Sequence, residues 1–271
     1  MDPDFDFKKL DIVTDRNNLR KLLRWAAGVS DKDVRIDVDQ VGNTLLFTRW
    51  ETKSTDTAGN GFGHTFELGM TRVATSCLGH QVTGHHRIVS FDFEGICMLV
   101  RFEVDACSAD VASANDSKSS DIADLLSGLD IKDKPRKHDH TVAGIKIIPS
   151  GTLIPQSSIV ELKTRSMQSP FDTKDAYSQL FFSQTPTLIL GRHTRGTFTS
   201  VDSMPLAGMV LEQQAAQAGL AKVAAALKNI SSVISRAKGE KFAIKIIGGE
   251  MKLYKRLEGD ALSKELKKEF E

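Results

Sequence analysis

The sequence has few cysteines, few aromatic residues and no long apolar run. Three cysteines among 271 residues cannot all pair with one another, so the composition indicates a reduced protein rather than one held by disulfides. No stretch approaches the roughly 20 apolar residues that a membrane-spanning helix needs, and the chain opens on acidic residues instead of a basic signal region. We therefore expect neither secretion nor a membrane partner, and a location in the nucleus or the cytoplasm.

The chain also lacks a strong charge of either sign, since its formal net charge is only +1. The charge is unevenly distributed, because the part from Gly219 onward holds 12 Lys and Arg against 7 Asp and Glu. Such a surplus can face a polyanion, but it is more often typical of a solvated helix face. Bulk charge alone therefore does not indicate a nucleic-acid-binding protein.

What the chain does have is enough length and apolar content for one sizeable domain, which we predict to cover residues 1–271. Apolar periodicity predicts an α+β fold, with a mixed β-sheet flanked by helices and one long amphipathic helix near the C-terminus. Residues 108–140 interrupt the pattern because they are rich in Ser, Asp and Lys, and we interpret them as a flexible insertion. The predicted helices are residues 17–27, 64–77, 173–183, 206–237 and 261–270, and the predicted strands are 34–38, 44–50, 87–93, 96–106, 142–148, 158–163, 187–190, 197–201, 242–247 and 250–257.

Acidic and basic side chains alternate with apolar ones in two of the predicted strands. Glu103 and Asp105 are two residues apart, and so are Glu161 and Lys163, so each pair is expected to project from one face of its strand. If the two strands are neighbours, three carboxylates and one ammonium converge. Carboxylates crowded in this way repel one another unless they share a cation, and Mg²⁺ or Mn²⁺ prefers such oxygen ligands. A surface strand with alternating polar residues gives the same pattern without any site.

An acidic pair followed by E-x-K on adjacent strands is the arrangement typical of PD-(D/E)XK nucleases. The chain as a whole resembles the DXO/RAI decapping-nuclease family, which has a PD-(D/E)XK-like fold. The resemblance runs in the family's order from about residue 10 to 200. It rests on segments around Arg16, Phe66-Glu67, Glu103-Val104-Asp105, Val160-Glu161-Leu162-Lys163-Thr164 and Gln179, of which the E-L-K-T segment is the most specific. Asp15 and Asn17 stand where the family has Trp and Gly, and Phe102 stands where it has Gly, so the chain resembles a divergent member.

The resemblance implies roles for individual residues. Lys163, Gln179 and Glu161 are the implied catalytic residues, and the implied metal ligands are Glu67, Glu103, Asp105, Glu161 and the backbone carbonyl of Leu162. Arg16 is implied in holding the 5′ nucleotide. Arg192 and Arg195 are further candidates for contacts with substrate phosphates, because they lie near a predicted hairpin tip close in sequence to these residues.

The function that the resemblance implies is a Mg²⁺- or Mn²⁺-dependent phosphodiesterase with a two-metal site, acting on single-stranded RNA 5′ ends. It would remove incomplete or non-canonical caps such as NAD, degrade RNA from 5′ to 3′, or do both, and a 5′-3′ exoribonuclease is an implied partner. Two alternatives stay open at this point. One is a catalytically weakened nuclease fold that serves as an RNA- or partner-binding module, and the other is a DNA exonuclease of the same fold.

Overall fold

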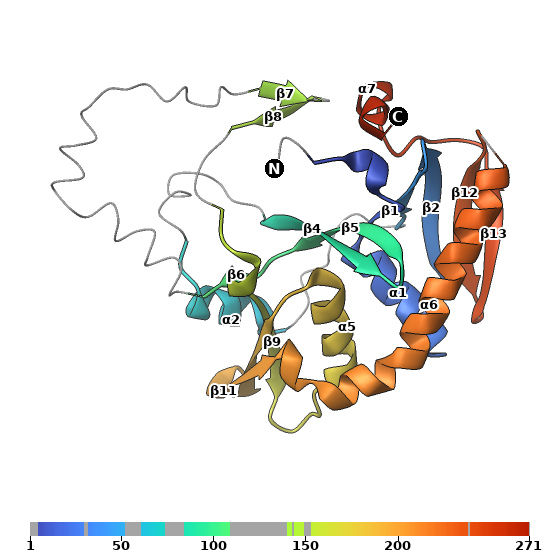
Figure 1. Cartoon of the computed structure of the whole chain (residues 1–271). Coiled ribbons are helices and arrows are strands. Elements are labelled where there is room, and N and C mark those ends of the chain that lie inside the picture. The colour runs from blue at the N-terminus through green and yellow to red at the C-terminus, as the bar shows by residue number, and fades with distance from the viewer. Residues whose placement is uncertain are drawn as a thin grey trace, which may run out of the picture.

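The computed structural model describes residues 5–29, 32–51, 61–73, 84–108, 140–142, 144–148, 153–237 and 239–270 (Figure 1). Most of the predicted insertion at residues 108–140 lies outside these ranges. The described part has two main β-sheets, of seven and four strands, and a separate two-stranded hairpin. No helix in these ranges is long and apolar enough to cross a membrane.

The seven-stranded sheet is mixed and is the larger layer of the molecule (Figure 1). β1 is parallel to both of its neighbours, and the other pairs are antiparallel. The predicted strands 87–93 and 96–106 pair as a hairpin that turns at Glu94 and Gly95, with φ of 53° and 77°, as expected for a two-residue turn between twisted strands. From one edge to the other, the strands are β13 (Glu250–Arg256), β12 (Lys241–Ile247), β2 (Val34–Val41), β3 (Thr44–Arg49), β1 (Ile12–Asp15), β5 (Ile96–Glu103) and β4 (His86–Phe93).

The four-stranded sheet follows the order β11 (Thr197–Pro205), β10 (Thr187–Thr194), β9 (Ile159–Ser166) and β6 (Ala106–Cys107). β9 and β10 are parallel, and the helix α5 (Thr173–Ser183) makes the crossover between them. β6 directly follows β5 in the chain but belongs to the other sheet. The chain therefore passes from one sheet to the other across Val104 and Asp105.

Three helices cover one face of the seven-stranded sheet and enclose the main core. These are α1 (Arg16–Ala26), α5 and α6 (Val210–Arg236), which contact one another and bury apolar side chains against that face. The long C-terminal helix is confirmed as one continuous helix of 27 residues. Gly219 does not break it, and a Cβ at this position would lie 2.9 Å from Leu23 Cδ1, so the glycine allows α1 to approach closely.

The helix α2 (Gly63–Met70) packs on the four-stranded sheet. Phe66, its only buried residue, lies against Gly191 of β10, and its ring packs against that of Phe198 with the centroids 4.8 Å apart. An added Cβ on Gly191 would lie within 2.8 Å of three ring carbons of Phe66, so the glycine makes room for the helix. Residues 74–77 of the predicted helix 64–77 lie outside the described residues, and residues 71–73 are not helical.

Three predictions of local structure were wrong. The predicted strand 96–106 ends at Glu103, because the chain leaves the larger sheet there. The predicted strand 142–148 is instead part of a hairpin, β7 (His140–Val142) and β8 (Ile145–Ile147), which turns at Gly144 with φ of 82°. The predicted helix 261–270 is only the short α7 (Lys264–Lys267) followed by a 3-10 turn, η6 (Lys268–Phe270), because Ser263 caps it and the preceding residues pack as coil. The other short 3-10 turns among the described residues are η1 (Phe7–Lys9), η4 (Gln156–Ser158) and η5 (Leu206–Gly208).

Candidate active site

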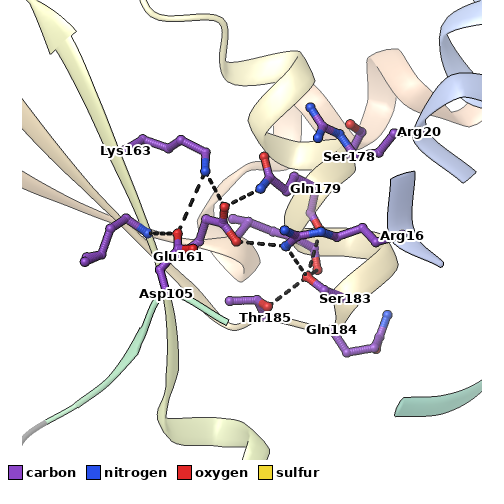
Figure 2. A network of polar contacts seen from close by, with 12 residues as sticks. Arg16, Arg20, Asp105, Glu161, Lys163, Ser178, Gln179, Ser183, Gln184 and Thr185 are labelled. Carbon is purple, nitrogen blue, oxygen red and sulfur yellow. Dashed lines mark hydrogen bonds and ion pairs between the residues drawn. The ribbon is translucent and has the colours of Figure 1, made fainter. Parts of the chain in front are cut away.

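Glu161 is the centre of the candidate site. It lies on β9, only 2% exposed, and a buried carboxylate is costly unless charged or polar groups compensate it. Arg16 Nη1 lies 2.8 Å from its Oε2, while Lys163 Nζ and Gln179 Nε2 both donate to its Oε1 (Figure 2). Burial alone raises the pKa of Glu161, but the Lys163 ammonium and the Arg16 guanidinium bring the pKa below its ordinary value. Glu161 is therefore an ionised carboxylate at neutral pH.

Two helices, α1 and α5, deliver Arg16 and Gln179 to Glu161, while Lys163 lies on the same strand as Glu161. Arg16 is the first residue of α1, which Asp15 caps by accepting a hydrogen bond from the Asn18 N–H at 2.8 Å. The Arg16 guanidinium also lies over the Phe102 ring, 5.5 Å from its centroid. Gln179 is 6% exposed on α5 and reaches Glu161 from the helix that makes the crossover between β9 and β10. The side chains of this cluster are therefore fixed by two helix–sheet interfaces at once.

Asp105 lies beside Glu161 in the link between the two sheets. Its Oδ2 accepts the Leu162 N–H at 2.8 Å, and Lys163 Nζ lies 3.9 Å from the same oxygen. Burial and the neighbouring Glu161 raise the pKa of Asp105 to about 7, although Lys163 and the Leu162 N–H oppose the shift and Glu67 adds to it. The raised pKa shows that the surroundings of Asp105 disfavour a second negative charge beside Glu161.

The predicted metal ligands are only partly brought together. Asp105 and Glu161 are neighbours, and Glu67 on α2 is half-buried and near enough to raise the pKa of Asp105. Glu103 is exposed on β5 opposite His86 of β4, and its Oε1 lies 3.2 Å from a Cβ built on Gly84. The expectation that Glu103 and Asp105 project from one strand was wrong, because the strand ends between them. Their roles as ligands, and that of the Leu162 carbonyl, stay predictions.

The two predicted phosphate contacts, Arg192 and Arg195, make no hydrogen bond or ion pair with the cluster around Glu161 among the described residues. Arg192 lies on the same face of the sheet as Lys163, because β10 pairs Leu190 with Lys163 and Arg192 is two residues after Leu190. It lies 3.7 Å from Asp202 Oδ2 and lines an open depression of about 430 Å³ with residues 167–170. Arg195 is exposed at the hairpin tip with φ of 48°.

Sequence reasoning missed two hydroxyl groups at the site. Ser183 Oγ lies 3.5 Å from Arg16 Nη1 and 2.8 Å from Thr185 Oγ1, and both hydroxyl residues are buried (Figure 2). Ser183 is four residues after Gln179, so the predicted helix already placed the two on one face. Helical spacing was therefore the signal that would have identified Ser183.

The donor set fits a divalent cation only in part. No group of three His, Cys, Asp or Glu side chains in the described ranges is close enough to hold a metal ion. Two carboxylates, Asp105 and Glu161, do lie together, and Lys163 Nζ contacts both. Their hard oxygen atoms suit Mg²⁺ or Mn²⁺, and the raised pKa of Asp105 indicates that added positive charge would be favourable there. Asp105 and Glu161 are thus the two described residues that would hold a cation, and the cation would replace the Lys163 ammonium in neutralising them.

Sequence comparison gives a family. Residues 1–266 match the model of a domain of unknown function, DUF8563. The chain belongs to the DUF8563 family. No curated protein matches this DUF8563 chain by sequence.

The DUF8563 chain is similar in structure to several solved proteins. For S. pombe Rai1 in complex with 3′-FADP, the TM-score is 0.62 at 14% identity, over 92% of this chain and 72% of that one. For Candida albicans Rai1 in complex with pU5 and Mn²⁺, it is 0.65 at 10% identity, over 96% and 75%. For K. lactis Dxo1 in complex with manganese, it is 0.54 at 10% identity, over 96% and 68%. The fold of the DUF8563 chain is therefore that of Rai1 and Dxo1, and the resemblance to the DXO/RAI family is confirmed at the level of the fold.

Proposed function

We propose that this chain is a metal-dependent phosphodiesterase that acts on RNA 5′ ends, removing non-canonical or incomplete caps such as NAD, degrading RNA from 5′ to 3′, or both. The observation that carries the proposal is the cluster in which Lys163, Gln179 and Arg16 meet the buried Glu161, with Asp105 beside it. The solved relatives support it, since the Candida albicans Rai1 structure holds pU5 and Mn²⁺. An exoribonuclease partner and a nuclear or cytoplasmic location stay predictions from the resemblance.

The side chains divide the work by their chemistry. Asp105 and Glu161 are the residues that would hold Mg²⁺ or Mn²⁺, with Glu67, whose charge reaches Asp105, as a predicted further ligand. A bound cation would supply activation of water and neutralisation of phosphate charge. Lys163 has three donors and, once released from the carboxylates, orients a non-bridging phosphate oxygen and stabilises its growing charge. Gln179 hydrogen-bonds the attacking water through its amide. Arg16 holds the Glu161 carboxylate in its rotamer and offers its remaining donors to the 5′ phosphate.

The nuclease proposal is tested by incubating the purified chain with Mn²⁺ and 5′-labelled single-stranded RNA that carries a monophosphate, triphosphate or NAD end. Glu161→Gln and Lys163→Ala are expected to lower the rate by about 10²- to 10³-fold, because each removes a charge that acts on the reacting phosphate. Lys228→Ala, an exposed position on α6, is the control for loss of a surface cation. Equivalent DNA in the same assay distinguishes RNA from DNA, because the 2′-hydroxyl is their only difference at the backbone.

One observation favours a second candidate, a catalytically weakened fold that binds RNA or a protein partner. Every oxygen of the Glu161 carboxylate is already engaged, by Arg16, Lys163 and Gln179. If these three contacts persist when Mn²⁺ is added, both lone pairs of Oε1 and one of Oε2 stay occupied, which leaves the Glu161 carboxylate little capacity to bind a metal. A folded protein that retains labelled RNA and cleaves none of the substrates would refute the enzyme and support this binding module.

A further inference from the structure

Four side chains form a row across the seven-stranded sheet, on the face away from its helices. On β12, Phe242, Ile244 and Ile246 point into the core under α6, so Lys245 points to the opposite, outer face. Lys245 pairs with Arg35 of β2 on one side and with Lys252 of β13 on the other. β2 and β3 are antiparallel and Ile36 pairs with Arg49, so the next residue, Trp50, lies opposite Arg35 and continues the row. We call these residues, Trp50, Arg35, Lys245 and Lys252, the outer row.

Aromatic rings accompany the cations of the outer row. Trp50 is 40% exposed and Tyr254, next to the row on β13, is 43% exposed. The Arg35 guanidinium lies 4.7 Å from the centroid of the Trp50 ring, and Lys245 Nζ lies 5.3 Å from that of Tyr254. Most aromatic residues in the described ranges are buried or half-buried, so two exposed rings beside cations on one sheet face need an explanation beyond core packing.

The charge of the outer row is only partly compensated. Lys245 ion-pairs with none of the carboxylates in the described ranges. Lys252 lies 2.7 Å from Glu250, but their side chains are 61% and 71% exposed, so water screens the pair and a competing anion can displace it. Arg35 is held by Asp37 at 2.7 Å, and it presents its guanidinium plane over Trp50. The side chains of Lys245, Lys252 and Tyr254, with Ile247 and Glu250, line a shallow depression of about 200 Å³.

An ion-pair network lies beside the row on the same face of the sheet, because Arg35, Asp37 and Asp39 are two residues apart on β2. Arg256 of β13 reaches across β12 and lies 2.6 Å from Asp39 and 3.5 Å from Asp37 of β2. All three side chains are at most 12% exposed. With Arg35, which Asp37 also holds, the network contains two cations and two carboxylates, so the unbalanced positive charge is at the Lys245 and Lys252 end of the face.

We propose that the outer row and Tyr254 form a second binding surface, for single-stranded RNA, separate from the cluster around Glu161. Bases stack on exposed aromatic rings and on arginine planes, and backbone phosphates pair with lysines, which is the combination that this face offers. Neighbouring strands are about 4.8 Å apart, so the row extends over about 14 Å, the reach of a short single-stranded segment. An acidic peptide would use the lysines but leave the rings without a role. The choice of RNA rests on the proposed function.

The surface is tested by fluorescence anisotropy with labelled oligo(U) RNA in EDTA, with all variants built on Glu161→Gln so that nothing is cleaved. Lys245→Glu with Lys252→Glu is expected to weaken binding at least ten-fold. It should also reduce the slope of log affinity against log salt by about 1.4, because two phosphate contacts are lost. Trp50→Ala and Tyr254→Ala are each expected to weaken binding about ten-fold. The matched control is Lys264→Glu with Lys268→Glu, which makes the same charge change at two exposed positions near the C-terminus.

The outcomes separate this surface from the proposed function. If the outer-row and control variants bind oligo(U) equally well, the surface is refuted, whatever the cleavage assay shows. If binding falls only in the outer-row variants while no substrate is ever cleaved, the surface stands and the nuclease fails. If the aromatic variants bind like the parent and a polyglutamate peptide displaces the RNA completely, the face is a general anion site and the RNA surface is refuted.

Discussion

Asp105→Asn is expected to make the metal-free protein more stable while it removes the candidate metal site. The asparagine side chain keeps an oxygen that can accept the Leu162 N–H, so the backbone contact at 2.8 Å is retained. The substitution removes the charge that burial and Glu161 oppose, which is the reason the pKa of Asp105 rises from 3.8 to about 7. The free energy of unfolding that Asp105→Asn gains should therefore depend on pH.

The sign and size follow from linkage between protonation and folding. An acid whose pKa is higher in the folded state makes folding less favourable as pH rises past its unfolded value, and the loss is complete above its folded value. For Asp105 the loss is about 2 kcal/mol at pH 5.5 and about 4 kcal/mol at pH 8. Asp105→Asn should therefore gain about 2 kcal/mol more at pH 8 than at pH 5.5.

Urea unfolding of the wild type and of Asp105→Asn in EDTA, at both pH values, measures this difference directly. An Mn²⁺ concentration 100-fold above the dissociation constant should then stabilise only the wild type, by about 2.7 kcal/mol. The control is Asp202→Asn, a carboxylate that is half exposed on β11, two strands away from β9 and Glu161. A gain for Asp105→Asn that is equal at the two pH values would refute the argument that this carboxyl is buried beside a like charge.

Two further predictions concern the elements that hold the site and the outer face. Gly191→Ala should destabilise the fold by about 1–3 kcal/mol and displace α2, because the new methyl group overlaps the Phe66 ring. Gly69→Ala, on the open surface of the same helix, should not destabilise it. The urea unfolding midpoints of the two variants test this, and equal midpoints would contradict the packing of Phe66 on Gly191. Arg256→Met should cost about 3–5 kcal/mol, because it leaves the Asp39 carboxylate buried without its cation. Calorimetric melting against Lys255→Met, whose ion pair is exposed, checks the second prediction, and a loss under about 1 kcal/mol would contradict it.

Local patterns were enough to predict most of the elements. Alternation identified the hairpin strands, and the glycines between them marked the turns, because these signals depend only on neighbours in the chain. The pairing of Glu161 with Lys163 on β9 was predictable for the same reason, since it needs only the two-residue repeat of a strand. Continuity of α6 through Gly219 was not, because the close approach of Leu23 is a tertiary contact.

The residues of the candidate site were predictable only where they belong to the family motifs. Alternation gave no sign that β5 stops at Glu103 and that Asp105 belongs to a link between sheets, since both residues fit one continuous strand pattern. The contact of Arg16 with Glu161 joins residues 145 positions apart, and no periodicity in the chain encodes it. Motif order suggested that both residues act together, but their ion pair came from the fold.

The chain assembles the candidate site from pieces that leave the ribosome far apart in time. Arg16 is translated early, Asp105 next, and Glu161 and Gln179 last. A nascent chain that ends before β9 would expose Arg16 without the Glu161 counterion and Asp105 with no strand beside it. No N-terminal fragment of that length can bind substrate through this cluster. Binding or cleavage activity during synthesis would therefore appear abruptly, once the residues that complete the four-stranded sheet have left the ribosome.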